Sequence, residues 1–438
     1  MIQKVMNLFV RLKSLYRQEG LLSNALHLTS GNGLAQVLTF AASPILTRVF
    51  SVDEFGQFGT FNAALSIMLL MSTGRLDYAM LLPKENLQGL RLGLAATLVA
   101  SVVSVTLILF MSMSGEHLLS VVHHPEMNKY YLLFGLNLFL MCVYSVLNFW
   151  ATRSNQFRSL ALANVANNGF TGLFQIGLGL WSSGPGLVWG QIIGRLFAFG
   201  LLAGRLAGSL AEVYSKEAIS LRTILGEAKA YRKFAGVNMI PTLVDAIIMF
   251  FPTFFFFQFY GAREAGFYLL AYRVMGAPTA LVANSSSNAL LPRLSLERFA
   301  REEVQRVMAL AFRRLTLLAL GFVPLLFLGA WAFPWIFGEQ WRAAATYGLW
   351  VSIPLTVKMI AQPLSGYLFC NDNKTFAIWQ VVYLLITIAT MVSIRTLNLP
   401  ADQGLKTMTL VDGAMLVIYL LVILRASGLS LIRLVRIS

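Results

Sequence analysis

The sequence predicts an all-α polytopic membrane protein with about twelve transmembrane helices in two six-helix lobes, and three observations lead to this prediction. Hydrophobic residues make up 57% of the 438 residues, and charged residues make up only 12%. Apolar segments long enough to cross a bilayer recur from Leu22 to Leu424. Lysine and arginine gather on alternate loops, which is typical of polytopic membrane proteins.

Twelve apolar segments account for the expected spans, and their boundaries are soft by several residues. They cover residues 22–49, 55–82, 88–114, 128–151, 157–181, 185–208, 236–260, 265–291, 311–335, 343–370, 375–397 and 405–424. Cys142 and Cys370 are the only cysteines and lie in or beside these segments, so we expect neither a disulfide framework nor a cysteine metal site.

The remaining segments are more polar and flank the two lobes. Residues 1–20 carry four basic residues beside a single apolar helical face, which predicts an interfacial amphipathic helix. The N-lobe is expected at 21–208 and the C-lobe at 235–424. Residues 209–234 read as a cytoplasmic linker helix between them, and residues 425–438 as a basic cytoplasmic tail.

The distribution of basic residues predicts the orientation. Of the 34 lysines and arginines, 24 lie at the N-terminus, on the even-numbered loops or at the C-terminus, and only six lie on the odd-numbered loops. Both termini are therefore expected in the cytoplasm. This bias and the attraction of anionic membrane lipids explain the net charge of +15 without a nucleic-acid partner.

A short motif after the first span returns after the seventh. Asp53-Glu54-Phe55-Gly56-Gln57-Phe58 is echoed by Arg263-Glu264-Ala265-Gly266-Phe267-Tyr268, at the same topological step of each half. Two six-span halves in the same orientation predict parallel repeats with a substrate path between them.

Several ionisable residues lie inside the predicted spans, where each costs about 2.5–3.5 kcal/mol on insertion scales and is a candidate for function. The cations are Arg75, Arg195, Arg273 and Lys358, and the acids are Asp77 and Asp245. A cationic lumen suits a diphosphate, because guanidinium groups bind phosphate oxygens bidentately. The acids could couple proton movement to transport. The alternatives are snorkelling of Arg75 and structural pairing of Asp245 with Arg273 or Lys358.

Amide side chains in the fifth span are candidates for sugar contacts. Asn167, Asn168 and Gln175 supply donors and acceptors there. Hydrogen bonding between helices is the commoner use of such residues in membranes, so this alternative stays open.

The sequence offers little support for an enzyme. It has no glycine-rich phosphate loop with a Walker lysine, which excludes an intrinsic ATPase of that type. Of the four histidines, His27, His117, His123 and His124, the adjacent pair lies in a short outer loop without a carboxylate cluster. We therefore expect no cofactor, no metal site and no catalytic residues.

Three motifs in order resemble the Wzx-type polysaccharide flippases of the multidrug/oligosaccharidyl-lipid/polysaccharide exporter (MOP) superfamily. They are Ser43–Arg48 followed by Phe55–Phe58, then Gly74–Pro83, and then Ala265–Val274 leading to Leu291–Arg293. The resemblance implies a two-lobed, MATE-like pseudo-twofold bundle in the bacterial cytoplasmic membrane. It also implies alternating-access transport of undecaprenyl diphosphate-linked oligosaccharide for O-antigen, capsule or exopolysaccharide assembly. Association with a polysaccharide polymerase and a chain-length regulator is left open.

Three other functions compete with this one. A cation-coupled multidrug exporter of the MATE type should have an acidic cavity, and the excess of buried Arg and Lys argues against it. A lipid-linked peptidoglycan precursor flippase usually has fourteen spans, against the twelve expected here. A non-transport membrane scaffold for a glycan-assembly complex would leave the mid-membrane charges unexplained.

The charge distribution generates a topology prediction. Reporter fusions at both ends of the chain and within residues 209–234 should report a cytoplasmic location, because lysine and arginine are retained on that side of the membrane. Fusions within residues 182–184, between the fifth and sixth spans, serve as the outward-facing control. An outward signal from the 209–234 segment would contradict the twelve-span topology.

Overall fold

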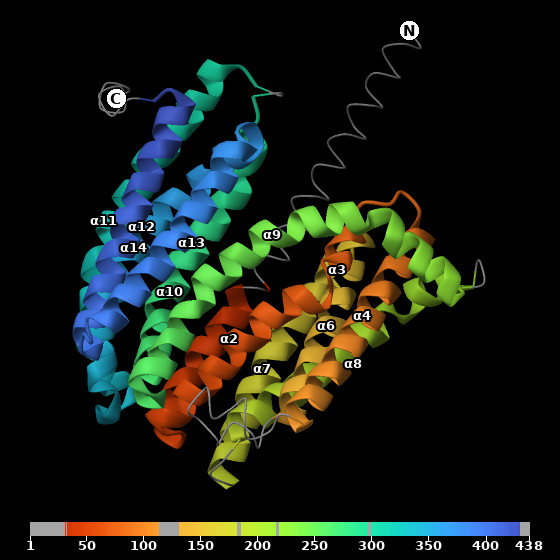
Figure 1. The fold of residues 1–438 in the computed structure, drawn as a ribbon, viewed down its shortest axis with the longest axis horizontal. Helices are drawn as coiled ribbons and strands as arrows, with labels where there is room; N and C mark the ends of the chain where they lie inside the picture. The colour runs from red at the N-terminus through yellow and green to blue at the C-terminus, as the bar shows by residue number, and fades with distance from the viewer. Residues whose placement is uncertain are drawn as a thin grey trace. The chain divides into compact units, whose positions relative to one another are not determined.

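The computed structural model describes residues 31, 33–113, 131–181, 185–215, 219–296 and 299–429, and this part of the chain is built of helices. The expected helix at 1–20 and most of the expected tail at 425–438 lie outside the described residues. Residues 33–49 are helical. The labelled helices (Figure 1) are α2 (Val52–Ser72), α3 (Leu76–Ala79), α4 (Asn86–Met113), α6 (Tyr131–Arg153), α7 (Phe157–Trp181), α8 (Gly186–Tyr214), α9 (Leu221–Tyr260), α10 (Ala262–Leu290), α11 (Arg301–Phe337), α12 (Arg342–Asn371), α13 (Asn373–Thr396) and α14 (Ala401–Ser427).

The all-α polytopic fold class is confirmed. Among the described helices, nine are long and apolar enough to cross a membrane, and the described part of each of the twelve expected spans is largely helical. Large apolar side chains on α11 point outward, with Phe327, Trp331 and Trp335 between 61% and 76% exposed. Such a surface suits contact with lipid. The chain is a multi-pass membrane protein.

Several helices differ from the expected spans. For example, α11 begins at Arg301 rather than at residue 311. Two further differences concern the second and seventh spans. The second span was expected as one helix over 55–82, but α2 ends at Ser72 and the short α3 begins only at Leu76. The seventh span was expected to begin at residue 236, but α9 runs without interruption through 40 residues from Leu221. The last part of the expected linker at 209–234 is therefore continuous with a membrane-spanning helix.

The chain packs as two compact units. Among the described residues, the first contains 31, 33–42, 68–113, 131–181, 185–215 and 219–239, and the second contains 43–67, 240–296 and 299–429. Residues 43–67 therefore group with the second unit by packing. The lobe boundaries expected from the sequence stay a prediction.

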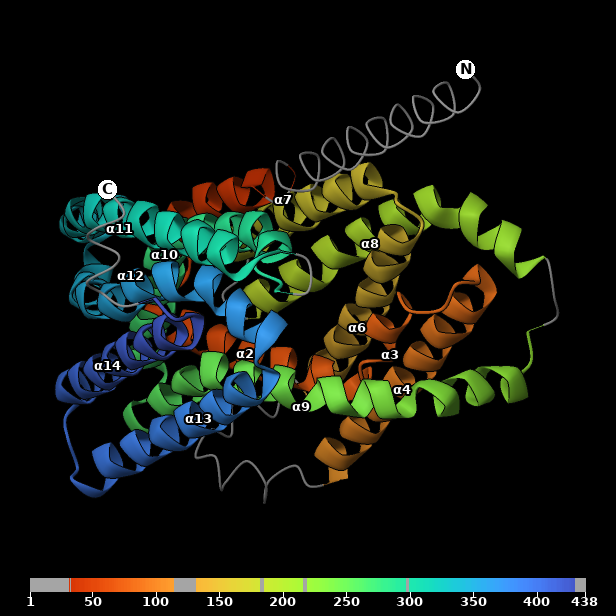
Figure 2. The same ribbon diagram turned by 90° about the horizontal axis from the view of Figure 1, so that it is seen from above.

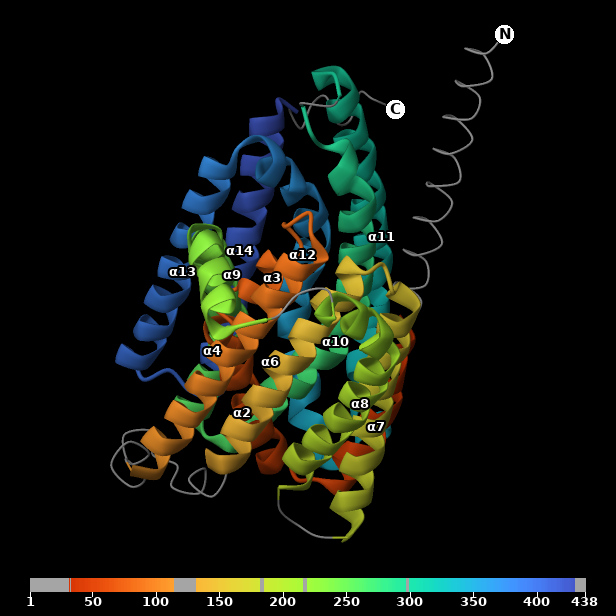
Figure 3. The same cartoon turned by 90° about the vertical axis from the view of Figure 1, so that its right-hand side faces the viewer.

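Close helix packing holds the first unit together. α7 and α8 lie side by side (Figure 3), because glycines on α8 allow a close approach. A Cβ at Gly190 would lie 2.5 Å from Gln175, and one at Gly194 would lie 2.4 Å from Thr171. Small residues at helix interfaces are typical of membrane bundles.

Arg153, in the last turn of α6, fixes the segment between α3 and α4. Its guanidinium donates to the backbone carbonyls of Met80, Pro83 and Glu85 at 2.6–2.8 Å, and to the side-chain oxygen of Asn86 at 3.1 Å. The guanidinium group of arginine has five N–H donors, so one side chain can supply all four of these hydrogen bonds. The basic residue therefore serves as a structural clamp on a segment that has few backbone hydrogen bonds of its own.

In the second unit, α12 lies next to α10, α11 and α14 (Figure 2). A tight turn joins α12 to α13, where the Asp372 carboxylate caps α13 by accepting a hydrogen bond from the Thr375 N–H at 3.1 Å. Hydrogen bonding from Thr375 also holds the pKa of the Asp372 carboxyl below its ordinary value. The turn is anchored by Asn371, which donates to the Leu294 carbonyl at 2.7 Å.

The two echoed motifs meet within this second unit. A Cβ at Gly56 on α2 would lie 1.8 Å from the carbonyl oxygen of Ala262, and a Cβ at Gly266 on α10 would lie 2.2 Å from the carbonyl oxygen of Val52. Each glycine thus packs on the backbone just before the other's motif. This reciprocal contact supports the interpretation that the motifs are equivalent positions of a duplicated unit.

The reciprocal contact predicts that neither glycine tolerates a side chain. Gly56→Ala or Gly266→Ala should lower the stability of the purified protein by about 1–3 kcal/mol, because the added methyl group would overlap a carbonyl oxygen of the other helix. Thermal unfolding in detergent measures the effect. Gly321→Ala on α11 is the matched control, since its Cβ would have no neighbour within 4 Å. Unchanged unfolding temperatures for both motif variants would contradict the tight crossing.

Candidate functional site

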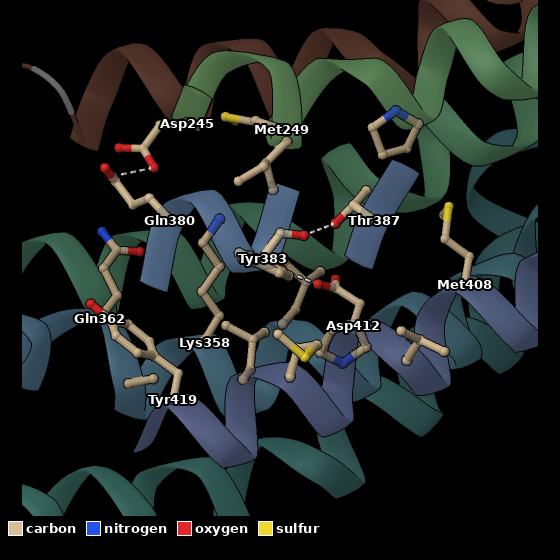
Figure 4. Close-up of a pocket in the computed structure, with 18 of the residues that line it drawn as sticks. Asp245, Met249, Lys358, Gln362, Gln380, Tyr383, Thr387, Met408, Asp412 and Tyr419 are labelled. Atoms are coloured by element: carbon tan, nitrogen blue, oxygen red, sulfur yellow. Dashed lines mark hydrogen bonds between the residues drawn. The ribbon is translucent and has the colours of Figure 1, made fainter. Parts of the chain in front are cut away.

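A cavity of about 380 Å³ lies inside the second unit (Figure 4). Helices α9, α10, α12, α13 and α14 supply its wall, which combines aromatic rings with amide, hydroxyl and charged groups. The chemically distinctive residues are Asp245, Tyr268, Tyr272, Lys358, Gln362, Trp379, Gln380, Tyr383, Asp412 and Tyr419. A partly apolar cavity with a few convergent polar groups is the usual form of a small-molecule site.

Both carboxylates in the cavity have a neutral hydrogen-bond donor from α13. Gln380 donates its Nε2 to Asp245 Oδ1 at 2.8 Å, and the Tyr383 hydroxyl donates to Asp412 Oδ1. These two donors are three residues apart, so one face of α13 serves an acid on α9 and an acid on α14. Neutral partners satisfy the carboxylates' hydrogen bonding without cancelling their charge.

Lys358 extends from α12 into the same cavity. Figure 4 shows its amino group between the Asp245–Gln380 pair and the Tyr383–Asp412 pair, and it acts electrostatically on both acids. Within the described part of the chain, Lys358 makes no hydrogen bond and no ion pair of 4 Å or less. The ammonium group therefore lies near the carboxylates of Asp245 and Asp412 without forming an ion pair with either of them.

Arg273 lies on α10, next to Tyr272, which lines the cavity. Its side chain is half-buried and is not among the residues of the cavity wall. No hydrogen bond or ion pair joins it to another of the described residues. The structure thus places Arg273 and Lys358 in one unit, on the neighbouring helices α10 and α12.

Arg195 belongs to the first unit and is tightly packed there. Its side chain on α8 is 7% exposed and donates through Nη1 to Asn137 Oδ1 on α6. The amide of Asn137, itself fully buried, donates in turn to Gln191 Oε1 at 3.0 Å. This network links α6 to α8.

Arg75 and Asp77 lie where the second predicted span is broken. Gly74 and Arg75 have φ of +54° and +58°, so the chain passes through two left-handed residues before α3. Hydropathy does not reveal this break, because apolar residues continue on both sides. A non-glycine residue in this region is strained, and such strain is frequent at functional sites.

The two side chains at this break do not pair with each other among the described residues. Asp77 is 3% exposed and accepts hydrogen bonds from the Ser145 hydroxyl and the Tyr78 N–H, both at 2.9 Å. The Arg75 guanidinium lies 4.8 Å from the ring centroid of Tyr78, in cation–π contact, and Tyr78 stacks on Phe234. The buried Nε of Arg75 has no hydrogen-bond partner.

The expected sugar contacts all lie on α7, in the first unit. Gln175 is 4% exposed and donates to the Leu187 carbonyl at 2.8 Å, so it joins α7 to α8. Asn167 has a buried carbonyl oxygen without a partner, and Asn168 is half-buried. None of the three lines the cavity of the second unit.

The structure adds residues that the sequence interpretation did not select. Asp412 lines the same cavity as Asp245, together with Gln380 and Tyr383. The spacing of Gln380, Tyr383 and Thr387 along one helical face was a signal in the sequence, but their convergence on two acids depends on the tertiary fold. Within the residues described, no group of three or more His, Cys, Asp or Glu side chains could hold a metal ion.

Comparison with solved structures shows the fold. The inward-facing conformation of a multidrug resistance MATE family transporter of the MOP superfamily aligns with a TM-score of 0.72 and 13% identity, over 90% of this chain and 94% of that one. Lipid II flippase MurJ in an inward closed conformation aligns with a TM-score of 0.69 and 14% identity, over 91% and 87%. An outward-facing MATE family transporter gives 0.61 and 11%, over 95% and 97%. The chain therefore has the pseudo-twofold MOP fold.

Comparison with protein families and curated sequences shows which family the chain is similar to. No curated protein matches the chain. A family model described as "Polysaccharide biosynthesis protein" matches residues 45–346, which is more than half of the chain and includes both echoed motifs. The chain thus belongs to this family of polysaccharide biosynthesis proteins.

Proposed function

We propose that this protein is a Wzx-type flippase that moves undecaprenyl diphosphate-linked oligosaccharide across the bacterial cytoplasmic membrane by alternating access. The cargo would then enter O-antigen, capsule or exopolysaccharide assembly. Family membership supports a role in polysaccharide biosynthesis. The fold shared with MATE transporters and with lipid II flippase MurJ supports a transport mechanism rather than an enzymatic one.

The proposal rests on the ammonium group of Lys358, which lies in the cavity without a hydrogen bond or ion pair to another described residue. A cation within a membrane-spanning helix is costly even when it is half-buried, as Lys358 is, and a purely structural one is normally fixed by a close anionic partner. Lys358 instead lies between two acids that are each bonded to a neutral donor. Such a cation is available to an anion that enters from outside, and a diphosphate is an anion of suitable chemistry.

The rest of the cavity wall suits the sugar part of the cargo. Gln362 and Gln380 offer amide donors and acceptors, and Tyr272 and Tyr419 offer hydroxyl groups and ring faces. A sugar needs hydrogen-bonding groups as well as apolar faces to bind in a cavity from which water is partly excluded. We propose these four residues as sugar contacts in addition to Asn167, Asn168 and Gln175.

The other interior cations are proposed to extend the path for the diphosphate. Arg273 and Arg75 make no ion pair with another described residue, so both are available to an anion. Arg195 would have to release Asn137 before it could contact the cargo. Asp77 and Asp245 are proposed as coupling or structural acids.

One observation favours a second candidate function, export of cationic compounds. Asp245 and Asp412 both line the cavity, and together they outnumber the single cation there. An acidic cavity would attract an organic cation. The effect of changing the charge of Lys358 separates the two candidates, because removing this cation should harm the binding of an anion and help the binding of a cation.

We expect Lys358→Gln to reduce surface glycan at least ten-fold in cells that depend on this protein, because the cargo loses its charge-assisted contact. Lys358→Glu should reduce it further, because a third acid would repel the diphosphate. Glycan staining of intact cells, together with immunoblots that confirm membrane insertion, measures the effect. Lys406→Gln is the matched control, since Lys406 is exposed and pairs with Asp402 at 3.2 Å. Normal glycan from an inserted Lys358→Glu protein would remove Lys358 from the path.

A second experiment tests the role of Asp245. Asp245→Asn should lower the unfolding temperature, because Lys358 loses one of its two nearby acids. The double variant with Lys358→Gln should recover part of the loss, with a coupling energy of about 0.5–3 kcal/mol in a double-mutant cycle. Thermal unfolding of the four purified proteins gives this energy. A stable Asp245→Asn protein whose transport no longer responds to a pH gradient would contradict pairing and indicate proton coupling instead.

A further inference from the structure

We propose that a groove on the first unit, formed by Gly31, Leu34, α7 and α8, binds the phosphate group of an anionic glycerophospholipid. The groove is lined by Gly31, Leu34, Arg158, Ala161, Leu162, Val165 and Arg205. It lies within one unit and shares no residue with the cavity that contains Lys358. The inference is thus independent of the proposed transport function.

Two arginines meet at one end of this groove because α7 and α8 run antiparallel. Gln175 faces Gly190 and Thr171 faces Gly194, so each step back along α7 corresponds to a step forward along α8. The same register places Arg205 level with residue 160, which is within one turn of Arg158. The fold therefore brings together two cations that are 47 positions apart in the sequence.

Both guanidinium groups are available to a ligand. Arg158 and Arg205 are exposed, and neither forms a hydrogen bond or an ion pair with any of the residues that the structure describes. Arg158 also lies in the first turn of α7, a 25-residue helix, where the helix dipole favours negative charge. Two guanidinium groups at one site can bind the oxygens of a phosphate through several charge-assisted hydrogen bonds.

The groove becomes apolar away from the arginines. Ala161, Leu162 and Val165 follow Arg158 at three, four and seven residues, so they lie on the same face of α7. Leu34 adds a second apolar wall and is 51% exposed. The groove is thus basic at one end and hydrocarbon-like along its length, which is the polarity of a phospholipid with its head group at the arginines.

The composition of the wall favours a phospholipid over the sugar-bearing cargo. Among the described residues that line the groove, none carries an amide, hydroxyl or carboxylate group in its side chain, so these residues offer an oligosaccharide few hydrogen-bond partners. The arginines also lie at the end of the bundle that the charge distribution predicts to be cytoplasmic. Basic pockets between transmembrane helices on that side are typical binding sites for anionic lipid head groups.

The test compares phosphatidylglycerol with phosphatidylcholine on the purified full-length protein in detergent, with lipid retention followed by native mass spectrometry. The wild type should retain phosphatidylglycerol in preference to phosphatidylcholine. Arg158→Gln and Arg205→Gln should each weaken retention about five-fold, and the double variant at least ten-fold. Arg222→Gln is the matched control, because Arg222 is an exposed arginine of the same unit on α9 and lies outside the groove. It should leave retention unchanged.

A steric variant keeps the proposal testable if the double variant fails to fold. Leu162→Trp should reduce phosphatidylglycerol retention without a change of charge, because the larger ring would occupy the groove. Three results would overturn the proposal: equal retention of the two lipids by the wild type, undiminished retention by both the charge and steric variants, or an equal loss in Arg222→Gln. Retention of polyisoprenyl diphosphate in place of phosphatidylglycerol would also overturn it, and would assign the groove to the transported lipid.

Discussion

The structure depends above all on how it accommodates charged side chains within apolar helices. In water these groups would be solvated, but inside the bundle most of them need polar partners from the protein, and here the partners are mostly neutral. Four hydrogen-bonded pairs follow this rule: Asp77 with Ser145, Arg195 with Asn137, Asp245 with Gln380, and Asp412 with Tyr383. Neutral partners leave the charge of each group in place. The interior therefore keeps an electrostatic field that a charged cargo or a proton can change.

The position of the cavity follows from the repeat architecture. Gly56 and Gly266 each pack on the backbone beside the other's motif, which fixes α2 against the start of α10. Trp341 strengthens this region, because its fully buried indole donates to the Thr47 carbonyl at 2.9 Å and contacts the ring of Phe55. α10 continues from this fixed point to Tyr268 and Tyr272, which line the cavity. The sequence echo between the two halves is thus connected to the site by one rigid helix.

Hydropathy predicted the helical segments well, because membrane insertion imposes a strong compositional signal on each span. It missed the break at Gly74 and Arg75, since a left-handed turn of two residues does not alter the average hydropathy of its surroundings. The candidate site was only partly predictable. Lys358 and Asp245 could be found because charge is rare in such segments. Asp412 and Tyr383 could be grouped with them only after the fold had brought α13 and α14 together. The hydrogen bond from Gln175 to the Leu187 carbonyl likewise depends on the packing of α7 against α8.

Reconstitution into liposomes would show whether the interior of the bundle serves a lipid-linked diphosphate. Purified protein would be reconstituted with a polyisoprenyl diphosphate-linked oligosaccharide that carries a fluorescent label, and a membrane-impermeant quencher would report the fraction exposed on each leaflet. The same liposomes would be tested with a fluorescent organic cation. We expect the protein to accelerate movement of the lipid-linked oligosaccharide between leaflets, and we expect Lys358→Glu to abolish this acceleration. Transport of the organic cation alone, undiminished by Lys358→Glu, would contradict this expectation.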